Sequence, residues 1–431
     1  MVAVDTSGIA AAQQPARPGV LAPLRSRAFA TLFAGYAFSA VGDGMAVVAV
    51  SWLAISLSRG RDTGLLVGAA VAAYTIPGVL AWLVLGRAVS GWDGRKLVLA
   101  DALLRAAGLG LIAGLALAGL LPEAGYVVLL GVSSLFGLLG VSGDLASVAE
   151  LLPAAQHLAG NSLVTVASFG AAIVGPALAG GVIAIAGPGT ALADDAASFA
   201  LLALAVLASR RFQPPPSRPA SRQTTRAALR ALGRQPAVLG ITVLCVVFFG
   251  VYGPVEVALP VYVSSVLHAG AGVLGGFWTV FSIGATAGAL GASWVERAGI
   301  WRVVVLVIAG WGACLIPFGF TDSLVAGFAA LAAGGLVYGP FLPLKSTIIQ
   351  RESPPGSVAA IAAASAVFTV SASPLGTALG GPLVGAIGPS ATLLASGLVT
   401  VTAAAVAALV LAARRHRRRR TRGTEIPRAR P

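Results

Sequence analysis

Two acidic residues stand out because each lies inside a long apolar stretch. Asp43 lies between two glycines and precedes an apolar run, and Glu256 lies between Pro254 and Pro260. A charged side chain in apolar surroundings is costly, so it is usually retained for a polar or functional contact. Asp43 indicates either a proton-titrating or substrate-binding group, or a hydrogen-bonded tie between two helices. Glu256 indicates either a carboxylate facing a cavity or one at the outer interface.

Other charged residues within apolar stretches predict a charge network. Asp101 and Arg105 are four residues apart, so on a helix they share one face and can neutralise each other. Asp144 and Lys345 lie toward the ends of two further stretches, and a lysine there can extend its ammonium group to water. We predict a network of these four residues, with Lys345 in a structural or gating role. The alternative for Asp101 and Arg105 is a purely structural pair.

Residues that would support enzyme chemistry do not gather in the sequence. Cys245 and Cys314 both lie in apolar stretches, and the three histidines are isolated, so neither set has the spacing of a metal site. A stretch at 339–346 lacks the glycine that precedes the lysine of a phosphate-binding loop. We therefore expect no catalytic residue, no metal and no cofactor, and a protein that is not an enzyme.

The elements that carry these residues are about twelve apolar stretches, each long enough to cross a bilayer. Hydrophobic residues make up 57% of the 431 and charged residues only 10%, and the mean hydropathy is +0.90. A helix of about 20 apolar residues crosses roughly 30 Å of hydrocarbon. Their length, without period-two alternation, excludes a β-barrel. The predicted spans are 28–57, 64–89, 97–121, 125–149, 159–186, 190–209, 237–263, 272–295, 302–320, 323–349, 357–387 and 390–413.

This order predicts an all-α polytopic membrane protein with two six-helix bundles, at 25–209 and 237–413. Residues 1–24 are polar and rich in Pro and Ala, so we expect a disordered cytoplasmic tail and not a cleaved signal peptide. Residues 210–236 predict a cytoplasmic linker, Pro-rich at first and then a basic amphipathic helix. Residues 414–431 predict an Arg-rich cytoplasmic tail.

The distribution of basic residues predicts the orientation. Most of the 29 Lys and Arg residues fall in the tails, the linker and every second loop, which the positive-inside rule places in the cytoplasm. Both termini are then cytoplasmic, in the plasma (inner) membrane. The net charge of +14 could suggest nucleic acid as a partner. We instead expect the arginine-rich tail to lie against anionic lipid of the inner leaflet, because it directly follows a span.

The loop between spans two and three resembles the signature of the major facilitator superfamily. It reads Gly-Arg-Ala-Val-Ser-Gly-Trp-Asp-Gly-Arg-Lys from Gly86 to Lys96. Members usually carry an Asp-Arg pair where this chain has Ser90 and Gly91. The resemblance implies a gating loop, in which Gly86, Asp93, Arg95 and Lys96 would take part.

Span five carries a second resemblance. Gly170, Gly175, Pro176 and Gly180 look like the glycine-proline motif in the fifth helix of the superfamily's drug:proton antiporters. Small residues allow close helix packing, and a proline withholds one backbone donor. The segment around Asp195 in span six is similar to the branch that holds enterobactin-type siderophore exporters and macrolide efflux proteins.

The resemblance implies a secondary transporter with a central cavity between two bundles, working by alternating access. It implies proton-coupled efflux of a small organic molecule (a drug, siderophore or secondary metabolite), with protons and substrate as partners. We expect Asp43 to couple transport to protons, with Glu256 as the other candidate. The alternatives are an uptake or facilitated-diffusion carrier of the same fold, and a polytopic membrane enzyme or a transporter-like sensor without flux.

Overall fold

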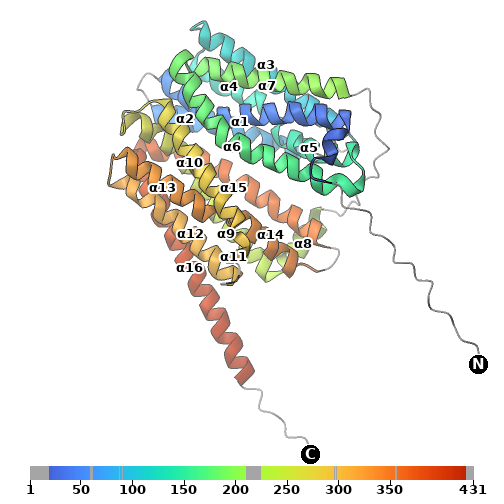
Figure 1. The fold of residues 1–431 in the computed structure, drawn as a ribbon. Coiled ribbons are helices and arrows are strands. Elements are labelled where there is room, and N and C mark those ends of the chain that lie inside the picture. Colours follow the sequence, from blue (N-terminus) through green and yellow to red (C-terminus); the bar gives the residue numbers. More distant parts are fainter. Residues whose placement is uncertain are drawn as a thin grey trace, which may run out of the picture.

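The computed structural model describes residues 19–58, 62–86, 88–89, 91–209, 225–295, 297, 299–354 and 357–423. In this part of the chain the regular structure is entirely helical (Figure 1). The longer helices of the first half are α1 (Arg27–Ser58), α2 (Thr63–Leu85), α3 (Gly94–Leu117), α4 (Glu123–Ser133), α5 (Gly137–Leu151), α6 (His157–Ala186) and α7 (Pro188–Ser209). Those of the second half are α9 (Pro236–Ser265), α10 (Ala271–Leu290), α12 (Ile300–Leu315), α13 (Leu324–Tyr338), α14 (Phe341–Glu352), α15 (Val358–Ile387) and α16 (Pro389–Gly423). Shorter elements are η1 (Ala22–Arg25), η2 (Ala154–Gln156), α8 (Thr225–Gly233), α11 (Ala292–Val295) and η4 (Ile316–Gly319).

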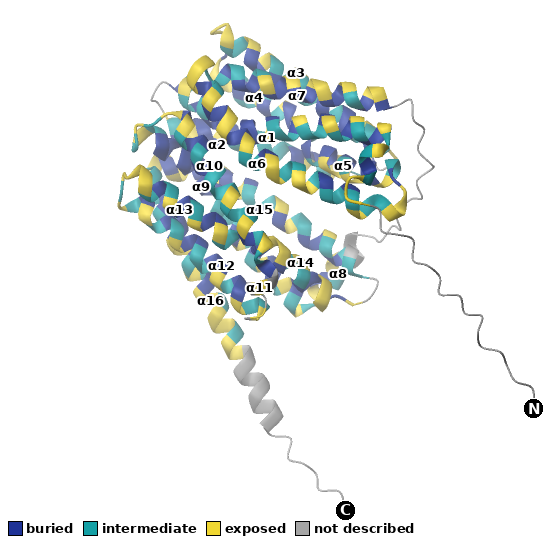
Figure 2. Cartoon of the chain, in the orientation of Figure 1, coloured by how far each residue is buried: buried dark blue, intermediate teal, exposed yellow. Residues whose placement is uncertain are grey.

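Twelve helical segments in the described residues are long and apolar enough to cross a membrane. Each corresponds to one predicted span, with ends that shift by a few residues, so the predicted all-α membrane fold is confirmed. Helix surfaces that face away from the molecule contain many exposed residues (Figure 2), and many of these are large and apolar. In a bilayer these side chains need not be buried inside the protein, because they can contact the hydrocarbon of the lipid.

Two of the described spans each consist of two α-helices, and they are the fourth span of each half. The fourth span breaks between α4 and α5, and the tenth breaks between α13 and α14 at Gly339 and Pro340. The first break provides a hydrogen bond to a backbone carbonyl of a neighbouring helix. The Ser134 hydroxyl donates to the carbonyl of Ala73 at 2.9 Å. Pro77 in α2 has no N–H to give that carbonyl. The break therefore supplies a donor that lipid could not.

The two halves meet mainly through two helix pairs, α2 with α15 and α6 with α10. Glycines permit the approach: a Cβ atom at Gly68 would lie 2.6 Å from the Cα of Gly381, and one at Gly180 would lie 2.8 Å from the Cα of Gly272. These contacts lie at the start of α2 and α10 and near the end of α6 and α15. All four ends lie on the face away from α8 (Figure 1), so the halves are closed together on that face.

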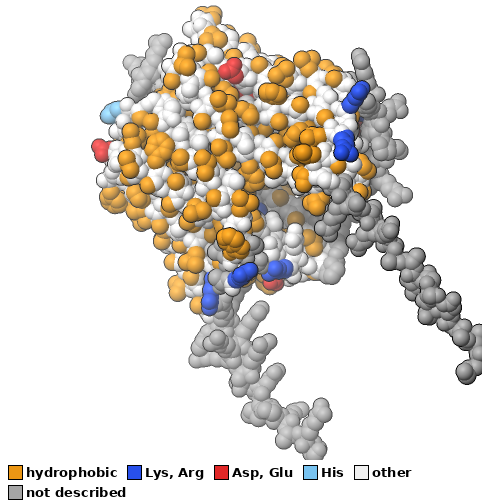
Figure 3. Space-filling view, viewed as in Figure 1, with side chains coloured by type: hydrophobic (Ala, Val, Ile, Leu, Met, Phe, Trp, Pro, Cys, Tyr) orange, Lys and Arg blue, Asp and Glu red, His pale blue; other side chains and the backbone are white. Residues whose placement is uncertain are grey.

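On the linker face the halves diverge (Figure 1), and the surface is hollowed between them (Figure 3). The blue Lys and Arg side chains in Figure 3 also gather toward this face. The structure is therefore closed at one end of the helices and open at the other.

The structure describes only part of the predicted tails and linker. Residues 1–18, 210–224 and 424–431, which include most of the first tail, the end of the second and the Pro-rich part of the linker, lie outside the described residues. The last residues of the predicted disordered tail form the 3₁₀ turn η1, with Pro23 buried. The predicted tail at 414–431 begins inside α16, which continues to Gly423 because Arg is a good helix former and no Gly or Pro precedes that position in the tail.

Candidate functional site

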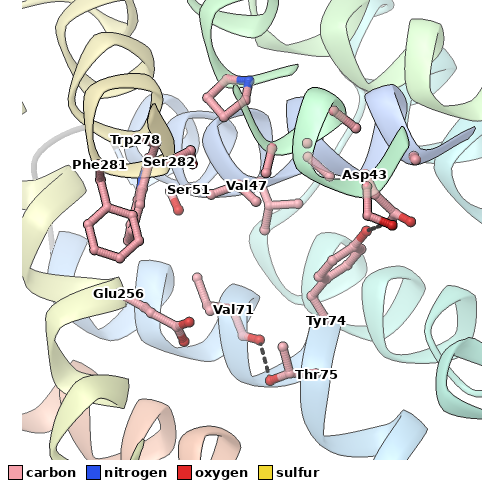
Figure 4. A pocket seen from close by; sticks show the side chains of 18 of the residues that line it. Asp43, Val47, Ser51, Val71, Tyr74, Thr75, Glu256, Trp278, Phe281 and Ser282 are labelled. Atoms are coloured by element: carbon pink, nitrogen blue, oxygen red, sulfur yellow. Dashed lines mark hydrogen bonds between the residues drawn. The ribbon is translucent and has the colours of Figure 1, made fainter. Parts of the chain in front are cut away.

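A cavity of about 530 Å³ lies between the halves and is lined by α1, α2 and α6 from the first half and α9 and α10 from the second (Figure 4). Asp43 and Glu256 line it from opposite halves. No Lys, Arg or His is among the described residues that line it. Its remaining walls are apolar and aromatic with a few hydroxyls, which is the usual lining of a small-molecule site. The lining includes Tyr36, Val47, Ser51, Tyr74, Thr75, Ser168, Pro176, Tyr252, Trp278, Phe281 and Ser282.

Asp43 is isolated in the sequence but paired in the fold. Its Oδ1 accepts from Arg105 Nη1 at 2.8 Å and from the Tyr74 hydroxyl at 3.1 Å, so it joins α1 to α3 and α2. The Asp43 side chain is nevertheless 49% exposed, because it opens into the cavity, whereas that of Arg105 is 12% exposed. Asp43 therefore ties helices together and also faces the cavity.

Arg105 is the centre of the polar cluster in the first half. Its Nε donates to Asp101 Oδ1 at 3.1 Å, and its Nη1 donates to the Tyr74 hydroxyl at 3.0 Å. The guanidinium carbon lies 5.0 Å from the ring centre of Phe199, within the range of cation–π contact. Gly137 faces the guanidinium from α5, where any larger side chain would collide with it. The predicted Asp101–Arg105 pair is thus present, but Arg105 also binds Asp43 and Tyr74.

Glu256 has a different environment. Its Oε2 accepts from the Thr377 hydroxyl at 2.9 Å and from the Ser373 hydroxyl at 3.4 Å, both on α15. No ion pair to Glu256 occurs among the described side chains. Ser373 and Thr377 are four residues apart and so lie on one face of α15, where they hold the carboxylate. Glu256 lines the cavity and does not lie at the outer interface.

Asp195 lies behind the cavity wall in α7. It is fully buried, and its Oδ1, together with the Ser198 hydroxyl, lies against Gly42 of α1. A side chain at position 42 would collide with both, so Gly42 is the reason that a carboxylate fits between α1 and α7. Because Asp195 does not line the cavity, it is not a contact residue for a ligand there.

The predicted four-residue charge network is only partly assembled. Asp101 and Arg105 are in contact, but Asp144 on α5 has no ion pair within 4.0 Å among the described residues. Lys345 lies on α14 in the other half and donates to the Thr369 hydroxyl at 3.1 Å. Lys345 makes no ion pair with the first three among the described residues, and its part in the network stays a prediction.

The loop between spans two and three fastens helices within the first half. Asp93 caps α3, since its side chain accepts from the Lys96 N–H at 2.8 Å, and its contact with the Lys96 ammonium group at 3.5 Å is exposed. Arg95 Nη1 donates to the carbonyl of Ser209 at the end of α7, 3.1 Å away. Gly86 ends α2. Arg87 and Ser90 lie outside the described residues, and the gating role of this loop stays a prediction.

The glycine-proline motif of α6 lies where three helices meet. A Cβ at Gly175 would lie 2.6 Å from the Cα of Gly44 in α1. One turn on, Gly180 packs against α10. The Pro176 carbonyl also packs against α10. Gly170, in contrast, faces open space. An inter-half hydrogen bond lies beside the motif, from the Thr279 hydroxyl of α10 to the Ile173 carbonyl at 2.9 Å.

Several site residues escaped the sequence analysis. Tyr74, Trp278, Phe281, Ser373 and Thr377 were not selected, because aromatic and hydroxyl side chains are common in apolar spans. The four-residue spacing of Ser373 and Thr377 was a usable signal, since it puts two donors on one helix face. As for metals, the described residues contain no group of three His, Cys, Asp or Glu side chains that could hold an ion.

Residues 32–373 match the Major Facilitator Superfamily. The chain belongs to this superfamily. It is 31% identical over 398 residues to the multidrug efflux pump Tap of Mycobacterium tuberculosis, covering 88% of this chain and 91% of Tap. It is 27% identical over 391 residues to Tap of Mycolicibacterium fortuitum, covering 87% and 92%. A variant of the nucleoside transporter NupG has a similar fold, with a TM-score of 0.71 at 14% identity over 89% of this chain and 99% of NupG. The chain is therefore a multi-pass membrane transporter of the superfamily.

Proposed function

We propose that this protein exports a small organic molecule across the plasma membrane by alternating access, driven by the entry of protons. The observation that carries the proposal is the cavity between the halves, closed on one face and lined by one carboxylate from each half. The similarity to Tap, whose name describes multidrug efflux, supports efflux over uptake. A proton gradient can drive such export, since each unit of pH difference across the membrane supplies about 1.4 kcal/mol per proton.

The proposed orientation puts the linker, both termini and the arginine-rich tail in the cytoplasm, next to anionic lipid. The open face in Figure 3 is then the inner one, and the structure represents an inward-facing state. Reporter fusions after Arg222 and Arg420 should be cytoplasmic, and insertions near Glu123 and His268 should be external. An external reporter after Arg222 would contradict the orientation.

Transport is tested in a drug-sensitive bacterial host that expresses the chain. We expect cells that express the chain to accumulate less of at least one compound of a chemically diverse panel and to be more resistant to it. A protonophore should abolish both effects. The control is Gly175→Leu at equal membrane expression. Higher accumulation of the compound would favour an uptake carrier. A wild-type chain that changes the flux of no compound, in cells and in proteoliposomes, would favour a sensor or a membrane enzyme.

A further inference from the structure

Two charged residues of opposite sign stand at corresponding positions of the two halves. Asp144 lies nine residues before Pro153, and Lys345 lies nine residues before Pro354. Each is on the second helix of the broken fourth span of its half, α5 or α14. Resting on the proposed function, we infer that Asp144 and Lys345 form an ion pair between the halves when the linker face closes, and that this pair holds that face shut.

The helices that carry the two residues end in the same way. α5 ends at Leu151 and α14 at Glu352, and in both the next residue is extended and precedes a proline. Asp144 and Lys345 are therefore each seven residues before the last residue of their helix. Both helices run toward the face on which the halves diverge (Figure 1).

This correspondence has a geometric consequence. Two halves that are parallel repeats are related by an axis along the membrane normal. Residues at corresponding positions then lie at the same depth on either side of the axis, and they approach each other when the halves close together. Asp144 and Lys345 thus have matching depth as well as opposite charge.

Neither residue has an ionic partner in the state described here. Asp144 and Lys345 make no ion pair among the described residues, and the Lys345 ammonium group donates to the neutral Thr369 hydroxyl at 3.1 Å. Both residues are partly exposed, and the hollow of the linker face (Figure 3) gives water access to them. Closure excludes that water, and an unpaired charge away from water is costly. Each residue then needs a partner.

The surroundings of Asp144 are rich in negative charge. Asp43, Asp101 and Arg105 lie within electrostatic range of it. Together with Asp144 they comprise three carboxyl groups and one guanidinium. Tyr36, which lines the cavity, is also within range, so Asp144 lies toward the cavity side of α5. A further cation on this side would be stabilised.

The surroundings of Lys345 are neutral. Thr369 of α15 accepts from its ammonium group, and the thiol of Cys245 on α9 lies within electrostatic range. Both of these neighbours are buried. The first half therefore has an excess of carboxyl groups near α5, and the second half has a cation on α14 that no carboxylate of the described residues pairs with.

Such a pair acts as a gate because it stabilises one state only. In the open state water solvates the two charges separately, and in the closed state each cancels the other. A contact shifts a two-state equilibrium by the difference in its free energy between the two states. Loss of the pair should therefore favour the state described here and slow transport.

The first test uses the wild-type chain in proteoliposomes. The chain has two lysines, Lys96 and Lys345. A water-soluble carbodiimide activates a carboxyl group, and an amine in contact with that group forms an amide while the carbodiimide leaves as its urea with one carboxyl oxygen. We expect mass spectrometry to find an amide between Asp144 and Lys345. The positive control is the amide between Asp93 and Lys96, whose charged groups are 3.5 Å apart.

The second test removes the charges one at a time. Asp144→Asn and Lys345→Gln should each increase hydrogen–deuterium exchange at the ends of α5 and α14, and each should lower transport by about tenfold. The double variant Asp144→Lys with Lys345→Asp should restore both toward wild type, which a merely structural role would not. Glu123→Gln, at an exposed carboxylate at the other end of the fourth span, is the matched control and should behave as wild type.

Three results would overturn the inference. The first is the control amide without the amide between Asp144 and Lys345, and this result decides the case in which a variant fails to fold. The second is a double variant that is no better than the single variants. The third is an effect of Lys345→Gln without one of Asp144→Asn, which would show that Lys345 serves an anionic group of the cargo. A wild-type chain that changes the flux of no compound would instead reject the proposed function, and the cross-link is measurable in that case too.

Discussion

The two halves place a carboxylate at the cavity by different means. In the first half, Asp43 is part of an ion-paired cluster with Arg105 and Asp101. In the second half, two neutral hydroxyls of α15 hold Glu256. The charge of Asp43 is balanced by a cation within the protein, whereas hydroxyls orient Glu256 without cancelling its charge. The comparison teaches that similar residues in related halves can lie in very different electrostatic surroundings.

The helix that carries Asp43 depends on Gly175, and we expect the largest effect from a change there. Gly175→Leu should separate α6 from α1, because a Cβ alone would lie 2.6 Å from Gly44. Transport should be lost at near-normal membrane expression. Gly170→Leu is the matched control, since Gly170 of the same motif faces open space. Equal transport by both variants would show that the motif does not position Asp43.

Arg105→Gln tests whether the stability of the first half depends on the Arg105 guanidinium. The change leaves Asp43 and Asp101 without their partner, and removal of one member of a buried pair costs about 3–5 kcal/mol. The partial exposure of Asp43 favours the lower value. Thermal unfolding in detergent should show the loss. Lys96→Gln, in an exposed pair, should stay within about 0.5 kcal/mol of wild type. Equal stability of the two variants would contradict the contrast between the halves.

Thr377→Val tests the support of Glu256. The variant keeps the shape of the side chain but removes a hydrogen bond to a charged group, worth about 1.5–3 kcal/mol. We expect this loss in unfolding experiments, and also weaker cargo binding, because the carboxylate is less well oriented. Thr402→Val, at an exposed hydroxyl that donates only to its own helix, is the control. Unchanged cargo binding by Thr377→Val would show that α15 does not position Glu256.

Asp43→Asn should have the smallest effect on stability. Arg105 retains Asp101, and asparagine can still accept from Tyr74, so we expect a loss of about 1 kcal/mol. The informative measurement is transport under a pH difference. If the variant exchanges substrate at equal concentrations but no longer accumulates it, the coupling role belongs to Asp43, as the sequence suggested.

Much of the fold was predictable because lipid imposes simple rules. Each span must be helical and about 20 residues long, and all twelve appear where hydropathy placed them. The predicted membership of the major facilitator superfamily is likewise confirmed. The breaks in the fourth and tenth spans were not predicted, because Ser134 reveals its purpose only beside the Ala73 carbonyl in another helix.

The sequence by itself determined which charges lie at membrane depth, because each of them stands within an apolar stretch of about twenty residues. Only the tertiary structure decided their partners. Asp43 and Arg105 are 62 residues apart, and Glu256 and Thr377 are 121 apart. Hydropathy reports how deep a residue lies but not which way its helix is turned. The rotation of each helix is set by close contacts such as Gly44 with Gly175, and the resulting packing places one carboxylate beside an arginine and the other beside two hydroxyls.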